Sequence, residues 1–125
     1  HMILIYLDKD DVVTGIDAFL HNVEELMKGE PNRALSRAIT HFSAANRVKK
    51  VIIVQALPGT ENPEINSISN DILGTIIAKM VLFDIQTVDC ILMGTKNYFS
   101  FKESEGAWDK LQLSVKQTSE FLGVK

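Results

Sequence analysis

The segment from Val48 to Asp71 places a strong constraint on the fold. Four consecutive β-branched residues, Val51–Val54, are typical of a central strand that is covered on both faces. This strand leads directly into Gln55-Ala56-Leu57-Pro58-Gly59, and a helix capped by Asn66 or Ser67 is expected about ten residues later. Ends of strands are where many α/β proteins bind their ligands. The segment therefore predicts a strand–loop–helix unit whose strand end is the first place to look for a site.

Two hairpins are predicted on either side of this unit. The paired strands are Ile3–Leu7 with Val12–Leu20, and Thr87–Met93 with Tyr98–Phe101. Their turns are the polar segment Asp8–Asp11 and the segment Gly94–Asn97. Antiparallel hairpins argue against a purely parallel, doubly wound sheet, so the sheet is expected to be mixed.

Three helices are predicted from apolar residues that recur at helical spacing. The first follows Pro31, the second follows the capping residue Asn66 or Ser67, and the third starts near Ala107. Their apolar faces hold, in order, Leu35, Ala38, Ile39, Phe42 and Ala45; Ile68, Ile72, Ile76, Met80 and Phe83; and Trp108, Leu111, Val115 and Leu122. The order β-β-α-β-α-β-β-α predicts an α/β or α+β domain with a mixed sheet flanked by helices.

Length and composition suit a single globular domain over 3–125. The 125 residues are 46% hydrophobic and 23% charged, which is enough to build one core. His1-Met2 resembles the remnant of an expression tag. No apolar run approaches the ~20 residues of a membrane-spanning helix, so no membrane association is expected. The single cysteine, Cys90, cannot form an internal disulfide, which favours a cytoplasmic location.

The charge distribution gives little support to a nucleic-acid partner. The net charge of −3 provides no bulk attraction to phosphates, and no basic stripe is interleaved with aromatic residues. Arg47, Lys49 and Lys50 form a local positive cluster, but a solvated helix-to-strand turn is the better explanation for it. The sequence therefore allows a nucleic-acid partner, but its charge distribution does not favour one.

The C-terminal hairpin carries a resemblance to a known family. The segment DIQTVDCILMGTKNYFSFKESEG, Asp84–Gly106, resembles the RadC branch of the JAB/MPN (JAMM) domain superfamily. That branch has a strand Leu-Asp-His followed by three aliphatic residues and a glycine, and then a strand Tyr-x-Ser-Phe-Arg-Glu. Val88–Gly94 and Tyr98–Glu103 stand at these positions. The likeness runs from Ile3 to Gly106 and implies a three-layer domain of the cytidine deaminase-like type.

The resemblance also implies where a metal site would lie. Active members bind zinc through a His-x-His-Pro motif and an aspartate at the start of the next helix, and an upstream glutamate acts as general base. Three protein ligands leave a fourth position for a water, whose pKa zinc lowers towards ~7 so that hydroxide can attack a carbonyl. Here Pro58 is kept, but Gln55 and Leu57 stand at the two histidine positions. Leucine offers no ligand atom, and a glutamine carbonyl is a poor zinc ligand.

The third ligand falls on Asp71 when a gap is allowed in the loop. An ungapped match places Ile68 there instead, and then no ligand survives. An acidic residue in the first turn of a helix is also favoured by the helix dipole alone. The upstream glutamate has no secure counterpart among Asp17, Glu24 and Glu25. We therefore expect no metal and no cofactor.

Other reactive residues do not form a familiar site. His21, His41 and Cys90 lack the spacing of a metal-binding pair, and Cys90 lies in a strand pattern where a buried, inert thiol is expected. Leu57–Thr60 is too short and too poor in glycine for a phosphate-binding loop.

The leading hypothesis is a catalytically inactive RadC-like JAB/MPN domain that binds or scaffolds a protein partner or a second copy. The resemblance also implies an association with DNA repair. The partner surface is expected at Pro58, Thr60, Asn62, Tyr98 and Phe99, although a plain structural loop would explain the first three. One alternative is a zinc-dependent JAMM-type hydrolase with a site rebuilt from Gln55, Asp71 and a histidine. A weaker alternative is a doubly wound domain that binds a small molecule at its strand ends.

Overall fold

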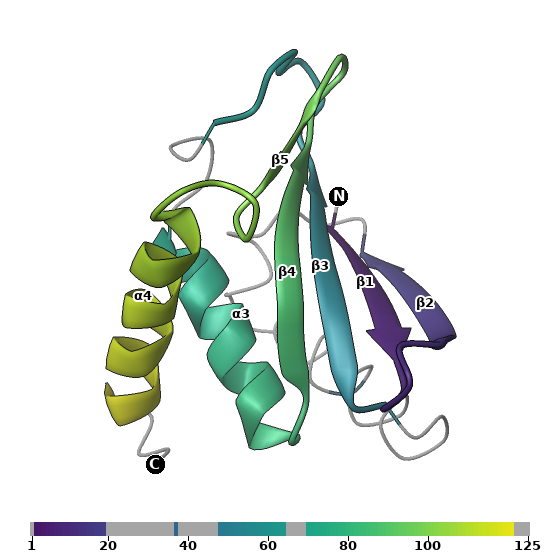
Figure 1. The fold of residues 1–125 in the computed structure, drawn as a ribbon, viewed down its shortest axis with the longest axis vertical. Coiled ribbons are helices and arrows are strands. Elements are labelled where there is room, and N and C mark those ends of the chain that lie inside the picture. The colour runs from purple at the N-terminus through teal and green to yellow at the C-terminus, as the bar shows by residue number, and fades with distance from the viewer. Residues whose placement is uncertain (1, 20–36, 38–47, 65–69, 122–125) are drawn as a thin grey trace.

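The computed structural model describes residues 2–19, 37, 48–64 and 70–121 of the chain, which form a five-stranded mixed sheet with two helices (Figure 1). The strands are β1 (Met2–Leu7), β2 (Val13–Phe19), β3 (Lys50–Ala56), β4 (Gln86–Met93) and β5 (Tyr98–Ser100), and the helices are α3 (Asn70–Leu82) and α4 (Ala107–Phe121). The spatial order of the strands is β2-β1-β3-β4-β5. β3 and β4 run parallel, whereas the other neighbours are antiparallel. The chain is thus an α+β domain with an open mixed sheet.

The predicted strands and both predicted hairpins are confirmed, and β3 is the central strand. β1 begins at Met2, whose side chain is fully buried, although the sequence assigned this residue to a tag remnant. The helices predicted after Ser67 and near Ala107 are present as α3 and α4. The helix predicted after Pro31 lies outside the described residues, as do the capping candidates Asn66 and Ser67.

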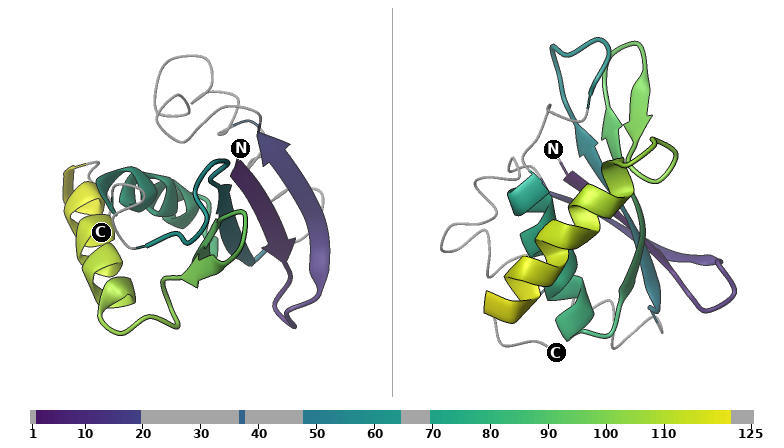
Figure 2. Two further views of the ribbon diagram at one scale, coloured as in Figure 1. Left: turned by 90° about the horizontal axis from the view of Figure 1, so that it is seen from above. Right: turned by 60° about the vertical axis from the view of Figure 1, so that its left-hand side comes forward.

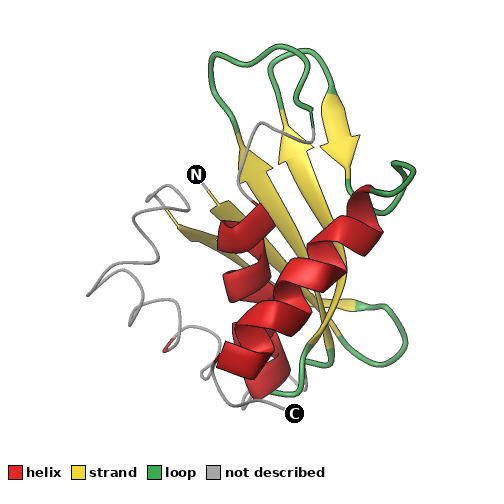
Figure 3. Ribbon diagram, turned by 90° about the vertical axis from the view of Figure 1, so that its left-hand side faces the viewer, coloured by secondary structure: helices red, strands yellow, loops and turns green. Residues whose placement is uncertain are grey.

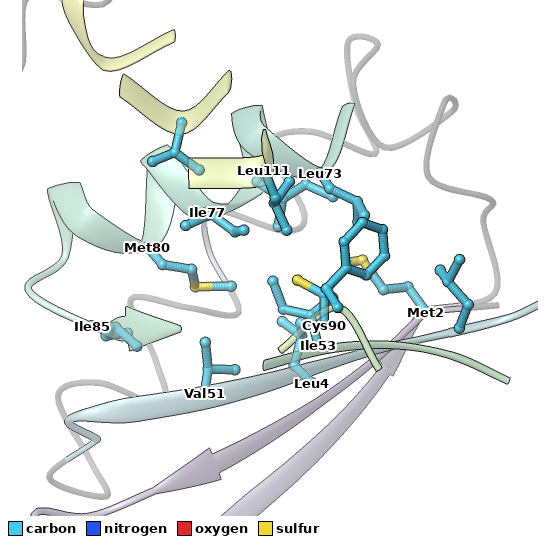
Figure 4. Close-up of a cluster of buried hydrophobic side chains, with 14 of the residues drawn as sticks. Met2, Leu4, Val51, Ile53, Leu73, Ile77, Met80, Ile85, Cys90 and Leu111 are labelled. Atoms are coloured by element: carbon cyan, nitrogen blue, oxygen red, sulfur yellow. The ribbon is translucent and has the colours of Figure 1, made fainter. Parts of the chain in front are cut away.

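Both described helices lie on the same face of the sheet, which we call the helix-covered face (Figures 2 and 3). Alternate residues of the strands point to this face because successive side chains of a strand alternate in direction. Figure 4 shows how they meet the helices in one core. The core holds Met2, Leu4 and Tyr6 of β1, Val51 and Ile53 of β3, Cys90 and Leu92 of β4, Leu73, Ile76, Ile77 and Met80 of α3, and Leu111 and Val115 of α4.

The end of α3 is closed by backbone hydrogen bonds. Ile85 N–H donates to the Met80 carbonyl at 2.9 Å, and Asp84 N–H donates to the Val81 carbonyl at 3.0 Å. Asp84 adopts a positive φ of 59°. This pattern is a Schellman motif, which satisfies carbonyls at the helix end and turns the chain into β4.

β3, α3 and β4 form a βαβ unit that determines where a site can lie. Since β3 and β4 are parallel, α3 must start at the end of the sheet where β3 finishes (Figure 1). The carboxyl end of β3 and the start of α3 therefore lie at the same end of the domain. A doubly wound fold needs several adjacent parallel strands, and the described sheet has one parallel pair, so that alternative is set aside.

Among the described residues, no helix combines the length and the apolar composition required to cross a bilayer.

Candidate functional site

Gln55 is a polar residue in an apolar part of the core. It lies next to the end of β3, on the helix-covered face, and pairs with Met2 of β1 and Leu92 of β4. Its side chain is only 4% exposed. Gln55 Nε2 donates a 2.9 Å hydrogen bond to the Ala56 carbonyl, whereas Oε1 is buried and has no hydrogen-bond partner. A buried acceptor without a partner costs about 1–3 kcal/mol, so this amide is the most unusual polar group at the strand end.

Leu57, which the sequence analysis expected at the position of a histidine ligand, stands directly after β3. Its N–H donates a 2.9 Å hydrogen bond to the Met93 carbonyl, which extends the β3–β4 ladder by one residue. Its side chain is half-buried and packs against the hydrophobic core. Leu57 therefore acts as a core residue, and it contributes no atom that could bind a metal.

Asp71 is the second residue of α3, but its side chain lies outside the described part of the chain. Its neighbour Asn70 has a buried Oδ1 without a hydrogen-bond partner. Within the described ranges, no group of three His, Cys, Asp or Glu side chains is placed to hold a metal ion. The candidates His21 and His41, and the possible general bases Glu24 and Glu25, lie outside these ranges. Leu57 and the amide of Gln55 do not fit zinc.

Asp17, the remaining candidate for the upstream acid, lies in β2. It pairs with Leu4 of β1, and Leu4 pairs with Ile53 of β3. Asp17 is therefore on the same face of the sheet as Gln55 but two strands away, and the strand spacing puts their Cα atoms about 12 Å apart. Its carboxylate raises the pKa of the Tyr6 phenol, in addition to the larger effect of burial.

The loop after β3 packs against the turn between β4 and β5 through its backbone. Thr95 N–H donates to the Thr60 carbonyl at 2.8 Å, and Lys96 and Asn97 N–H groups both donate to the Glu61 carbonyl at 3.1 Å. The amide of Asn97 adds a 2.5 Å hydrogen bond to Asn62 Oδ1. These contacts give the loop a defined structural role, in addition to any role in binding.

Gly94 makes this close packing possible. A Cβ atom at this position would lie 2.6 Å from both the Thr60 carbonyl oxygen and Pro63 Cδ, and 2.7 Å from the Glu61 carbonyl oxygen. Such distances are too short for any side chain larger than hydrogen. The glycine that follows β4 therefore has a local steric reason in this chain.

The five residues predicted as a partner surface separate into two groups. Pro58, Asn62 and Tyr98 are exposed and Thr60 is half-buried, all around the packed loop and turn. The Tyr98 hydroxyl lies 3.5 Å from Glu103 Oε2. Phe99 points instead to the core, where its ring contacts Phe101 edge to face at 5.2 Å between centroids. The alternation of side chains along β5 explains this difference.

A hollow of about 230 Å³ lies beside the loop, lined by Ala56, Leu57, Pro58, Met93, Gly94 and Thr95. A second hollow, of about 410 Å³, lies near the start of β3 and β4 and is lined by Lys49, Val81, Asp84, Ile85 and Gln86. Neither hollow is lined by Gln55. The buried amide and the open hollows are therefore separate features.

An interaction that the sequence analysis missed joins β4 to β5. Asp89 Oδ2 accepts a 2.5 Å hydrogen bond from Ser100 Oγ, and Asp89 Oδ1 accepts from the N–H groups of Cys90 and Lys102 at 2.7 and 3.1 Å. Ser100 Oγ in turn accepts from Glu103 N–H at 3.1 Å. An aspartate inside an otherwise apolar strand was the signal that could have predicted it. The network fixes the turn that leads from β5 to α4.

Cys90 is buried, as the sequence predicts, at 1% exposure on the helix-covered face. Burial raises the pKa of its thiol, and the neighbouring Asp89 carboxylate raises it further. A protonated, inaccessible thiol is a poor nucleophile and a poor metal ligand.

Comparison with protein-family models and with curated proteins finds no match to this sequence.

Proposed function

We propose that the chain is a catalytically inactive RadC-like JAB/MPN domain of the three-layer, cytidine deaminase-like type, and that it acts in the cytoplasm as a binding or scaffolding module. The observation that carries the proposal is the state of Leu57. This residue stands at a zinc-ligand position of the resemblance, and its side chain packs against the core. A hydrolase of the JAMM type needs an imidazole there to hold the zinc that activates water.

The mixed sheet and the βαβ unit are compatible with this proposal. Gln55 and Leu57 are two residues apart, so their Cα atoms are about 6.7 Å apart along the strand direction, as in a His-x-His pair. The βαβ connection brings the start of α3, and with it the backbone of Asp71, to the same end of the sheet. In this proposal, the backbone positions of the three metal ligands are kept at Gln55, Leu57 and Asp71, but the two histidine side chains are lost.

A protein partner or a second copy is the partner that we propose. The net charge of −3 gives no attraction to nucleic acid, so an association with DNA repair would act through a protein contact. The exposed residues Pro58, Asn62 and Tyr98 form the proposed contact region beside the loop.

Metal content tests the loss of catalysis. We expect the purified protein to contain no stoichiometric metal by elemental analysis and to give no heat when titrated with zinc in a calorimeter. About one zinc per chain, lost in Asp71→Ala but kept in Asp109→Ala, would instead indicate a rebuilt hydrolase site. Asp109 is a matched control because it is the acidic residue in the first turn of the other described helix.

Restoring the ligands tests the resemblance itself. The double variant Gln55→His and Leu57→His recreates the His-x-His-Pro motif before Pro58. We expect it to bind about one zinc per chain, and Asp71→Ala in this background to weaken zinc binding at least about tenfold. A correctly folded double variant that binds no zinc would contradict the proposed alignment of β3 and α3 with the metal site.

A further inference from the structure

We draw no further inference here: the strongest candidate, the pair of buried acceptors Gln55 Oε1 and Asn70 Oδ1 at the end of the domain where β3 finishes and α3 begins, belongs to the strand-end site already described, and neither hollow in the described part of the chain adjoins it to show what ligand it would take.

Discussion

The hydroxyl of Ser100 donates a 2.5 Å hydrogen bond to the carboxylate of Asp89, and this contact joins β5 to β4. Ser100 is buried and Asp89 is half-buried. The same carboxylate accepts the backbone N–H of Lys102, and Ser100 accepts that of Glu103. One carboxylate and one hydroxyl therefore accept hydrogen bonds from two backbone N–H groups where β5 turns towards α4.

A double-mutant cycle on this pair should show strong coupling. We expect Asp89→Ala and Ser100→Ala each to lower the free energy of unfolding by about 1.5–3 kcal/mol, because hydrogen bonds to a charged group are the stronger ones and the remaining partner is left unpaired. The double variant should cost less than the sum of the two by about 1–2 kcal/mol. Urea unfolding measures all four proteins. Additive losses would show that the two side chains act independently. Asp109→Ala, at an exposed aspartate on α4, is the control and should change the free energy of unfolding by less than about 0.5 kcal/mol.

The sequence predicted those parts of the fold that depend on local pattern. The short apolar run Ile3–Leu7 and the β-branched run Val51–Val54 were predicted as strands, and both are strands in the structure. The turn Asp8–Asp11 was predictable from its aspartates, and Asp8 Oδ1 indeed accepts from the N–H groups of Asp10 and Val12. Such features need no knowledge of distant residues.

Contacts between distant segments were not predictable from the same patterns. The sequence placed Phe99 on a surface, but strand alternation turns it to the core. It left open whether the loop of Pro58 and Thr60 is a partner surface or a plain structural loop, and it gave no sign that Gly94, far along the chain, allows this loop to pack against a turn. The unpaired Oε1 of Gln55 likewise depends on residues from neighbouring strands. Each of these depends on tertiary neighbours that the local sequence does not specify.

Replacing Gly94 with alanine should displace the loop that follows β3. The added Cβ would meet the Thr60 and Glu61 carbonyl oxygens at 2.6 and 2.7 Å, and backbone atoms cannot move away cheaply. We expect a loss of about 2–3 kcal/mol in urea unfolding, as for other overpacked sites. Gly59→Ala is the control: its φ of 87° strains an alanine, but no atom lies within 4 Å of the new Cβ. That variant should lose only about 1 kcal/mol. Equal losses in the two variants would contradict the steric role of Gly94.

Replacing Gln55 with methionine should stabilise the protein or leave its stability unchanged. Methionine has a similar volume and removes the buried Oε1 that has no hydrogen-bond partner. Removing the unsatisfied buried acceptor should raise the free energy of unfolding by about 1–3 kcal/mol. The substitution also removes the hydrogen bond from Gln55 Nε2 to the Ala56 carbonyl, which offsets part of this gain, so we expect a net rise of about 1 kcal/mol. Thermal unfolding measures the change. A loss above about 1 kcal/mol would show that the amide of Gln55 has a partner that stabilises the fold.

The stability of the protein should fall in alkaline solution because Cys90 is buried. Burial raises the pKa of the folded thiol above its ordinary value of 9.0, so the unfolded chain releases this proton first. The protonated Cys90 thiol therefore contributes its full stabilisation of the fold below pH 9.0. As the pH rises from there towards the pKa of the folded thiol, this contribution is lost by about 1.4 kcal/mol per pH unit. Tyr6, whose pKa is also raised by burial, adds a similar loss above its ordinary value of 10.0.

The variant Cys90→Ala isolates the contribution of the thiol. Between pH 9 and 10 its free energy of unfolding should fall less steeply than that of the wild type, by up to about 1.4 kcal/mol per pH unit. Lys79, whose pKa is lowered by burial, titrates in both proteins and cancels in the comparison. Urea unfolding at three pH values measures the slopes. Parallel slopes, or rapid reaction of the native wild-type thiol with a disulfide reagent at pH 8, would show that Cys90 is accessible in solution and that its thiol ionises freely.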